Sequence, residues 1–290
     1  MAVRKSKSQR IVMGIIFALF VLYAVTLLYP MIWMFLSSLK GSLEYETGNS
    51  LDLPKRWLFS NYGLAFESLV VRNKGGGTTS FFGMVWNSVW MNGISIVLGT
   101  LVSAITTYTV AKLQFPGKKV FYAVILFMMM LPIYGSMASS LQIKKQLGVF
   151  DNVFNVLVST FAVGGYKFLI LYAFFKSVSW SYAEAAYIDG ASHFQVFWNV
   201  MFPQALAPLA VFAIQDFIAG WNDYMSPLIY MPSYPTIASG LYQYESQMIR
   251  GMNYPVYFAG IVISAIPILI IFISMRKTFM TSLSMGGLKG

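Results

Sequence analysis

Long apolar stretches alternate with shorter polar ones along the chain, and six of the apolar stretches have the length of a membrane-spanning helix. Such a helix needs about 20 mostly apolar residues, because each residue adds about 1.5 Å and the hydrocarbon core is about 30 Å thick. The expected spans are residues 11–37, 84–113, 120–140, 153–175, 206–230 and 254–273. The pattern therefore predicts an all-α membrane protein with six transmembrane helices.

The first apolar stretch resembles a signal peptide only in its basic start, which includes Arg4 and Arg10. The apolar part of a signal peptide is usually about 7–15 residues long and ends at a small-residue cleavage site. The stretch 11–37 is longer and continues through the bulky run 29–34. We therefore expect a retained helix.

The composition agrees with a membrane protein, since 57% of the residues are hydrophobic and 10% are charged. A soluble domain of this length needs more charge to cover its surface. The net charge of +10 does not indicate nucleic-acid binding, because the basic residues flank the apolar spans and form no separate basic face. The lack of cysteine excludes disulfides, zinc fingers, iron–sulfur clusters and cysteine nucleophiles, and the single His193 excludes a multi-histidine metal site.

The distribution of Lys and Arg predicts that both chain ends lie in the cytoplasm. With that orientation the inner segments hold eleven Lys and Arg against two acids, Glu184 and Asp189. The outer segments hold eight against six acids, and five of the eight lie in the long first outer loop, which the positive-inside rule weights least. We expect a cytoplasmic N-terminus at 1–10, a membrane domain at 11–280 and a cytoplasmic tail at 281–290.

Small residues recur at intervals of four in the second span, at Ser95, Gly99, Ser103 and Thr107. Such a stripe lets another helix approach closely. The alternative is that small residues are merely tolerated there. Both interpretations concern packing and predict no chemistry.

The segment 177–203 is too polar to span a bilayer and too apolar for a simple solvated loop. Its first part predicts a short helix with good helix formers at 183–186, closed by Gly190 at a position suited to a positive φ. A second helical turn is expected to run to Pro203, where the next span can start.

The charges of this segment separate two interpretations. A helix lying on the bilayer surface carries basic residues on its polar face. Here Glu184 and Asp189 are acidic, and Lys176 is the one basic residue nearby. This favours a helix that docks into a groove of another protein.

A known signature covers the same segment. Its residues are Glu184, Ala185, Ala186, Asp189, Gly190, Ala191, Ser192 and Pro203. They resemble the EAA motif of permease subunits of binding-protein-dependent ABC importers, and the fuller runs EAAYIDGAS and FPQALAP are similar to the carbohydrate (maltose-type, shorter permease) version. The resemblance implies a type I ABC importer permease in which 177–203 is a coupling segment that docks into an ATPase subunit and transmits its closure.

Further runs extend the resemblance over nearly the whole chain. The inner loop 108–119, the run Trp221-Asn222-Asp223-Tyr224 and the ending 282–290 are family-like. The resemblance implies that the tail residues Gly286, Gly287 and Lys289 contact the ATPase dimer. The chain departs from the family at Ser179-Trp180, where many relatives have a proline, and in its long first outer loop.

The resemblance implies a multi-pass protein of a bacterial cell membrane that forms half of the pathway for a sugar. Its implied partners are a second homologous permease, two ATPase subunits and an extracytoplasmic solute-binding protein. ATP and Mg²⁺ belong to the ATPase subunits, and no cofactor is expected on this chain. A phosphate-binding loop at Gly117-Lys118-Lys119 is excluded, because Lys112 stands where such a loop needs Gly.

Ionisable residues inside apolar spans are candidate pathway residues. Lys167, Asp216 and Asp223 fall there, and burial of charge favours a structural pair or contact with an aqueous pathway. A proton relay is the alternative. Asn222 and Tyr224 join Asp216 and Asp223 as candidate pathway residues, because sugar sites combine aromatic faces with amides and carboxylates. An aromatic belt at the membrane interface is the competing interpretation.

The expected outer loop 231–253 is a candidate contact for the binding protein, because it gathers the aromatic and amide side chains of Tyr242, Gln243, Tyr244 and Glu245. In the maltose-type relatives the equivalent loop enters the sugar cleft of the binding protein. The competing interpretation is a simple covered turn.

Three other classes of function compete with the sugar importer. A membrane enzyme lacks support, since the chain has no H-E-x-x-H or G-x-S-x-G motif. A secondary transporter with six spans requires oligomerisation, and no clear repeat relates the two halves. An ABC importer for a non-sugar solute remains the nearest alternative.

Overall fold

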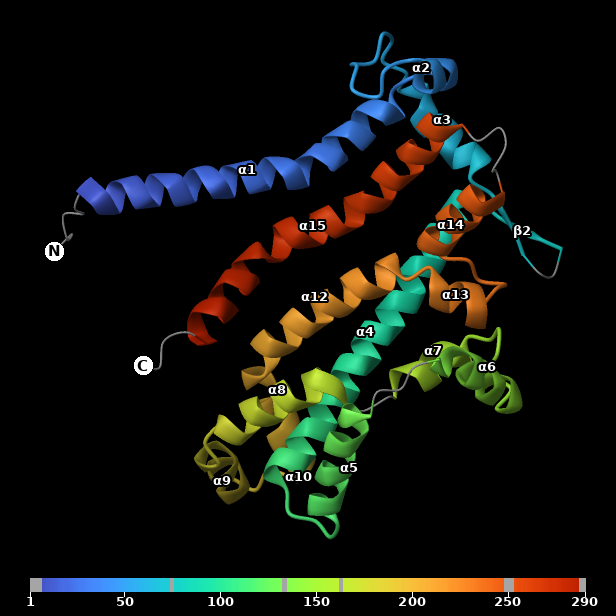
Figure 1. Cartoon of the computed structure of the whole chain (residues 1–290). Coiled ribbons are helices and arrows are strands. Elements are labelled where there is room, and N and C mark those ends of the chain that lie inside the picture. Colours follow the sequence, from blue (N-terminus) through green and yellow to red (C-terminus); the bar gives the residue numbers. More distant parts are fainter. Residues whose placement is uncertain (1–6, 74–75, 132–134, 162–163, 248–252, 287–290) are drawn as a thin grey trace. The chain divides into compact units, whose positions relative to one another are not determined.

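The computed structural model describes residues 7–73, 76–131, 135–161, 164–247 and 253–286. These residues are mostly helical, and the one sheet found among them is a two-stranded hairpin. The chain divides into two compact units, which are described separately (Figure 1). The first combines residues 1–69 with 244–265, and the second combines 70–243 with 266–290.

The first unit contains the N-terminal helix and the segment that follows it. Its helices are α1 (Lys7–Ser38), α2 (Ser42–Thr47) and α3 (Ser60–Ser68), and it includes the first turns of α15 (Tyr254–Gly286). The apolar side chains of α1 are exposed along most of its length. Because α1 buries so little within this unit, its apolar side chains need a covering of lipid or protein.

Hydrogen bonds from side chains to the backbone stabilise the segment after α1. Lys40 is 2% exposed, and its Nζ donates to the carbonyl oxygens of Asn49 at 3.3 Å and Ser50 at 3.4 Å. The amide Nδ2 of Asn61 donates to the carbonyls of Ser38 and Lys40, both at 2.8 Å. These bonds satisfy buried backbone carbonyls that a loop otherwise leaves unpaired.

The second unit holds most of the helices. They are α4 (Phe81–Lys112), α5 (Lys118–Met130), α6 (Ser136–Gln146), α7 (Phe154–Thr160), α8 (Gly165–Ser177), α9 (Ser181–Ile188), α10 (His193–Val196), the π-helix η1 (Phe197–Met201), α11 (Phe202–Gln204), α12 (Leu206–Asn222) and α13 (Met225–Tyr230). Helix α14 (Ile237–Gln247) belongs to this unit up to Gln243 and to the first unit from Tyr244. The hairpin β1 (Val71–Arg72) and β2 (Thr78–Thr79) precedes α4.

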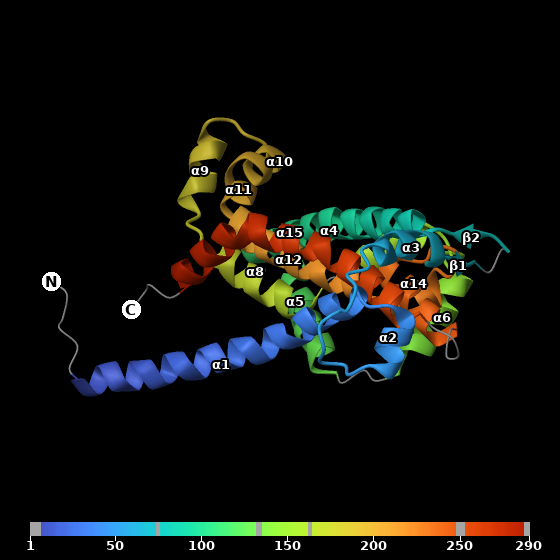
Figure 2. The ribbon, with the colours of Figure 1, turned by 90° about the horizontal axis from the view of Figure 1, so that it is seen from above.

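Helix α4 is the centre of this unit, and α7, α8 and α12 pack against it. Ser80 caps its start by accepting a bond from the backbone N–H of Gly83. Near its other end the ring of Tyr108 lies 5.7 Å from Phe175 of α8 and 5.1 Å from Phe197 of η1. The segment of α9, α10, η1 and α11 (residues 181–204) is therefore anchored in the same core as the long helices; we call it the α9–α11 hairpin (Figure 2).

Three of the expected spans correspond to single long helices. In the described residues α1, α4 and the part of α15 up to Met275 are long and apolar enough to cross a membrane. The count rises to five if each of two bent pairs is one span: α7 with α8, bent by 54°, and residues 193–204 with α12, bent by 73°. The chain is thus a helical protein with several membrane-spanning segments.

The expected third span, 120–140, is not one helix. Helix α5 ends at Met130 after 13 residues, and α6 begins at Ser136. Thirteen residues reach about 20 Å, less than the thickness of the hydrocarbon core. The fifth expected span also differs, because α12 ends at Asn222 and not near residue 230. The count of six spans stays a prediction.

Candidate functional site

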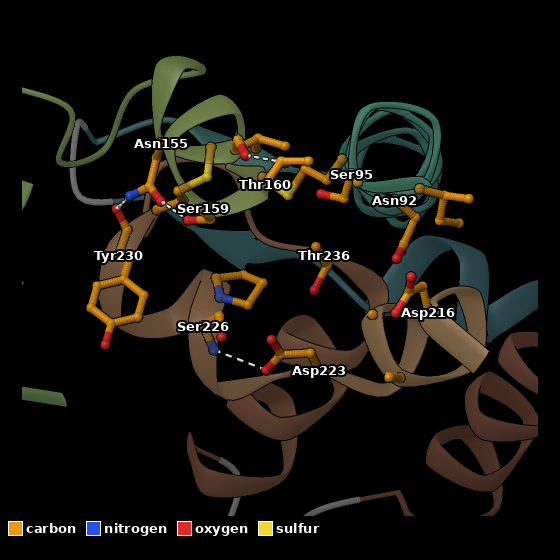
Figure 3. Close-up of a pocket in the computed structure, with 18 of the residues that line it drawn as sticks. Asn92, Ser95, Asn155, Ser159, Thr160, Asp216, Asp223, Ser226, Tyr230 and Thr236 are labelled. Carbon is orange, nitrogen blue, oxygen red and sulfur yellow. Dashed lines mark hydrogen bonds between the residues drawn. The ribbon is translucent and has the colours of Figure 1, made fainter. Parts of the chain in front are cut away.

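A polar cavity of about 740 Å³ lies among α4, α6, α7, α8, α12 and α13, all in the second unit (Figure 3). Its polar and charged lining residues include Asn92, Ser95, Ser103, Ser140, Lys144, Asn155, Ser159, Lys167, Asp216, Asp223, Ser226, Tyr230 and Thr236. Such a volume holds a small organic molecule.

One ion pair crosses the cavity wall. Lys167 in the first turn of α8 bonds Asp216 of α12, and their side chains are 27% and 32% exposed. The preceding residue of each helix forms a second link, because the hydroxyl of Tyr166 donates to Oε1 of Gln215 at 3.1 Å. Asn92 of α4 faces Asp216 in Figure 3. The predicted structural pair is confirmed, and it also lines the cavity.

Asp223 stands at the break between α12 and α13. Its Oδ1 accepts from the backbone N–H groups of Met225 at 3.0 Å and Ser226 at 2.9 Å. These bonds satisfy N–H groups that have no partner within a helix start. The backbone of Asp223 follows the last residue of α12, its carboxylate caps the start of α13, and the residue borders the cavity.

Lys144 contributes a second cation. Its Nζ donates to Oδ1 of Asn155 at 2.7 Å and to the hydroxyl of Ser159 at 2.9 Å, and it lies 4.2 Å from the ring centre of Tyr230. The partial burial of this ammonium lowers its pKa. Asn155 also donates to the carbonyl of Tyr230 at 3.3 Å, so one amide joins α7 to the end of α13.

Asp151, which bonds to Tyr230, has a strained backbone conformation. Asp151 has φ +54°, a conformation that non-glycine residues rarely adopt. Its carboxylate accepts from the backbone N–H of Ser233 at 2.9 Å and from the Ser233 hydroxyl at 2.7 Å. Its own N–H donates to the carbonyl of Tyr230 at 2.8 Å. These bonds hold the backbone in the αL region.

The α9–α11 hairpin folds through local contacts. Gly190 has φ +83°, and its N–H donates to the carbonyl of Tyr187 while the N–H of Ala191 donates to that of Ala186. This pair of bonds is a Schellman motif, which needs a left-handed residue at the position of Gly190. The predicted positive φ of Gly190 is confirmed.

The second helical piece begins at Ser192. Its hydroxyl accepts from the N–H of Gln195 at 3.4 Å, and Oε1 of Gln195 accepts from the N–H of Ser192 at 2.8 Å. This is a capping box. Pro203 lies in α11, three residues before α12 starts at Leu206.

An exposed face distinguishes the hairpin. Ile188 is 86% exposed, Phe194 71% and Tyr182 56%, and the carboxylates of Glu184 and Asp189 are exposed beside them. At the base, Nζ of Lys112 donates to the carbonyl of Val178 at 2.5 Å. The hairpin is thus fixed to α4 at one end and presents apolar and acidic side chains at the other.

The chain matches the model of one protein family over residues 95–278, more than half of its length. That family is described as the binding-protein-dependent transport system inner membrane component. This chain belongs to it. The resemblance expected from the EAA motif is confirmed at the level of the family.

Relatives of this family align along almost the whole chain. The diacetylchitobiose uptake system permease protein NgcG of Streptomyces coelicolor is 28% identical over 285 residues, which are 97% of this chain and 90% of the relative. The arabinooligosaccharides transport system permease protein AraQ of Bacillus subtilis is 26% identical over 275 residues, 93% of this chain and 94% of that protein.

A solved structure shares the fold. The crystal structure of a bacterial ABC transporter involved in the import of the acidic polysaccharide alginate contains a chain with a TM-score of 0.80 and 24% identity. The likeness covers 94% of this chain and 98% of that one. The inner membrane component fold is thus shared along the length of this chain.

The structure brings together only part of the candidate pathway of this inner membrane component. Asp216 and Asp223 line the cavity, whereas Asn222 and Tyr224 do not. The amide of Asn222 donates to the carbonyl of Ile218 at 2.8 Å, and the ring of Tyr224 stacks on Tyr242 at 4.6 Å.

The candidate contact for the binding protein lies in a helix that forms within the expected outer loop 231–253. Tyr242, Gln243, Tyr244 and Glu245 belong to α14. Tyr244 is buried and stacks on Tyr257, whose hydroxyl donates to Glu245 at 3.1 Å. A sequence signal for this helix exists, because Thr236 and Ser239 exchange bonds at its start as capping residues do.

Several cavity residues had no sequence signal of their own. Only the folded structure brings together Lys144, Asn155 and Tyr230, which lie apart in the sequence. The stripe of small residues is an exception, since Ser95, Gly99 and Ser103 line the cavity in addition to packing near α7.

The expected contacts between the tail and the ATPase dimer stay a prediction. Gly286 ends α15, and Gly287 and Lys289 lie beyond the described residues. Within the described residues no group of three His, Asp or Glu side chains is placed to hold a metal ion.

Proposed function

We propose that this chain is one of two permease subunits of an ATP-driven importer and forms half of the pathway for an oligosaccharide. The observation that carries the proposal is similarity over nearly the full length to permeases whose names specify diacetylchitobiose and arabinooligosaccharides. The polar cavity supports it, since hydroxyl, amide and tyrosine side chains suit a sugar.

The α9–α11 hairpin is proposed as the coupling segment that docks into an ATPase subunit. Glu184, with the neighbouring Ala185 and Ala186, lies in a helix that exposes Ile188, and Phe194 is exposed on α10. Large exposed apolar side chains beside acidic ones fit a protein groove with a basic rim. The base, held by Lys112 and the Tyr108 core, passes movement of the hairpin to α4 and α8.

The other partners follow from the same proposal. A second homologous permease supplies the other half of the pathway, and two ATPase subunits bind ATP and Mg²⁺. An extracytoplasmic binding protein delivers the sugar and contacts the outer end of α14, where Tyr242 is exposed. The tail residues Gly286, Gly287 and Lys289 contact the ATPase dimer.

The proposed location is a bacterial cell membrane, with a cytoplasmic N-terminus (1–10), a membrane domain (11–280) and a cytoplasmic tail (281–290). The absence of native cysteine makes this orientation simple to test. A cysteine at Ser192 should be labelled by an impermeant maleimide only from the cytoplasmic side, and a cysteine at Ser246 only from outside. The reverse pattern removes the hairpin from any cytoplasmic ATPase.

Reconstitution tests the function as a whole. The chain, its partner permease and the ATPase subunits are placed in proteoliposomes with the binding protein, and uptake of labelled oligosaccharides is measured. We expect uptake that stops without ATP and survives collapse of the proton gradient. Uptake that follows the proton gradient, or ATP hydrolysis by the purified chain alone, contradicts the proposal.

A further inference from the structure

We infer that the polar cavity selects uncharged sugars over acidic ones, because every charged side chain that lines it is already ion-paired or hydrogen-bonded within this chain. The inference rests on the proposed function. It goes further by naming the charge class of the substrate, on which the family and its fold are silent. The fold alone is shared with a transporter of an acidic polysaccharide.

The charges on the cavity wall balance in number. Among the described lining residues two are cationic, Lys144 and Lys167, and two are anionic, Asp216 and Asp223. An excess of cations favours an acidic sugar, since each carboxylate that leaves water must find a charged or hydrogen-bonded partner. The described lining residues show no such excess.

Lys167 is compensated by Asp216. The two groups are in direct contact, so an entering carboxylate would have to compete with Asp216 for the same ammonium. That competition also places two carboxylates close together, which is unfavourable. A sugar hydroxyl can bond the pair without separating it.

Asp223 is compensated by backbone. Its Oδ1 accepts from the N–H groups of Met225 and Ser226, so these donors are occupied. The carboxylate of an acidic sugar at this position would meet the Asp223 carboxylate, and both of these N–H donors are already occupied. A hydroxyl group can instead donate to the carboxylate.

Lys144 is compensated by neutral groups. Two of its three donors go to Asn155 and Ser159, and its charge lies over the ring of Tyr230. Among the described residues no carboxylate is within ion-pair distance of its Nζ. An amide oxygen and an aromatic face stabilise this ammonium in place of an anion.

Neutral polar groups complete the wall. They include the amide of Asn92 and the hydroxyls of Ser95, Ser140 and Ser226, with the rings of Tyr166 and Tyr230. These groups match alternating hydroxyl and apolar faces of a pyranose. The chemistry of the wall is therefore that of an uncharged saccharide site.

Direct binding to the purified complex in nanodiscs, without the binding protein, tests the inference. The probes are three trisaccharides, each titrated at low and high salt. Maltotriose and tri-N-acetylchitotriose are neutral, and trigalacturonate is acidic. The acetylated form of chitotriose is used because chitotriose itself carries amines. We expect saturable binding of at least one neutral probe and at least tenfold weaker binding of trigalacturonate.

Each result has one meaning. Trigalacturonate binding as tightly as the best neutral probe overturns the charge inference and leaves the importer proposal intact. A complex that hydrolyses ATP but binds none of the probes overturns the cavity as a sugar site. Loss of ATP-driven uptake of every sugar overturns the proposed function instead.

A single substitution gives an independent test. Asp216→Asn leaves Lys167 without its partner, so affinity for trigalacturonate should rise about tenfold over the unmodified complex while salt weakens the gain. Glu67→Gln, which removes one exposed carboxylate outside the cavity, should change neither probe. If Asp216→Asn forms an intact complex and shows no gain, the charges of the cavity do not set its selectivity.

Discussion

The α9–α11 hairpin and the polar cavity are built in opposite ways. The hairpin is closed by bonds between near neighbours, such as Ala191 to Ala186 and Ser192 to Gln195. The cavity is lined from six helices, and its key bonds join residues as distant as Lys167 and Asp216. A local device can be altered without disturbing the helices around it, whereas a change in the cavity wall is felt in both stability and substrate contact.

The largest expected effect comes from Gly190→Pro. Proline fixes φ near −65°, whereas this position has φ +83°, and it removes the N–H that bonds Tyr187. The cost of about 3 kcal/mol or more falls on the hairpin alone. We expect normal membrane insertion with more than a tenfold loss of binding-protein-stimulated ATP hydrolysis. Gly190→Asn, which tolerates this φ, should retain most of it; equal hydrolysis in both variants contradicts a coupling role.

The next effect concerns attachment of the ATPase. Glu184→Lys reverses an exposed charge on α9 and should weaken the complex by about 1–3 kcal/mol, because a partly desolvated ion pair becomes a repulsion. Retention of the ATPase subunits during purification at several salt concentrations measures it. Glu67→Lys on α3 is the matched control. Full retention in the Glu184 variant removes this residue from the contact.

A stability effect should mark the cavity. Lys167→Ala leaves Asp216 partly buried without its partner, which we expect to cost about 1–2 kcal/mol, less than a fully buried pair since both side chains are about a third exposed. Thermal unfolding of the detergent-solubilised complex reports this. Lys119→Ala, at an exposed position, should leave the midpoint unchanged. An unchanged midpoint for both shows that the pair is not stabilising.

The smallest effect is that of Ser192→Ala. It removes the hydroxyl that caps α10, at a cost of about 1 kcal/mol confined to the hairpin. We expect ATPase stimulation to fall by a few fold with no change in unfolding of the whole complex. Ser192→Thr keeps the cap and should behave like the unmodified protein. A lowered unfolding midpoint would mean that the hairpin and the long helices are one cooperative unit.

The sequence predicted what depends on near neighbours. Gly190 and the apolar spans of α1, α4 and α15 could be predicted because turns and apolar length are local properties. The cavity could not be read in this way. Asn222 and Asp223 are neighbours in sequence, yet α12 ends at Asn222 and Asp223 lies in the break after it, and of the two Asp223 lines the cavity. The bend between α12 and the preceding turns likewise depends on packing and has no single-residue signal.

The buried Lys40 has a consequence for biogenesis. Its bonds, and those of Asn61, join residues no more than 23 positions apart. Closing such short loops has a small entropic cost and needs no helix from later in the chain. Synthesis proceeds from the N-terminus, so these hydrogen bonds around Lys40 can form as soon as residue 61 has been synthesised and has left the ribosome. The exposed helix α1 would then be fixed at one end before most of its later neighbours are inserted.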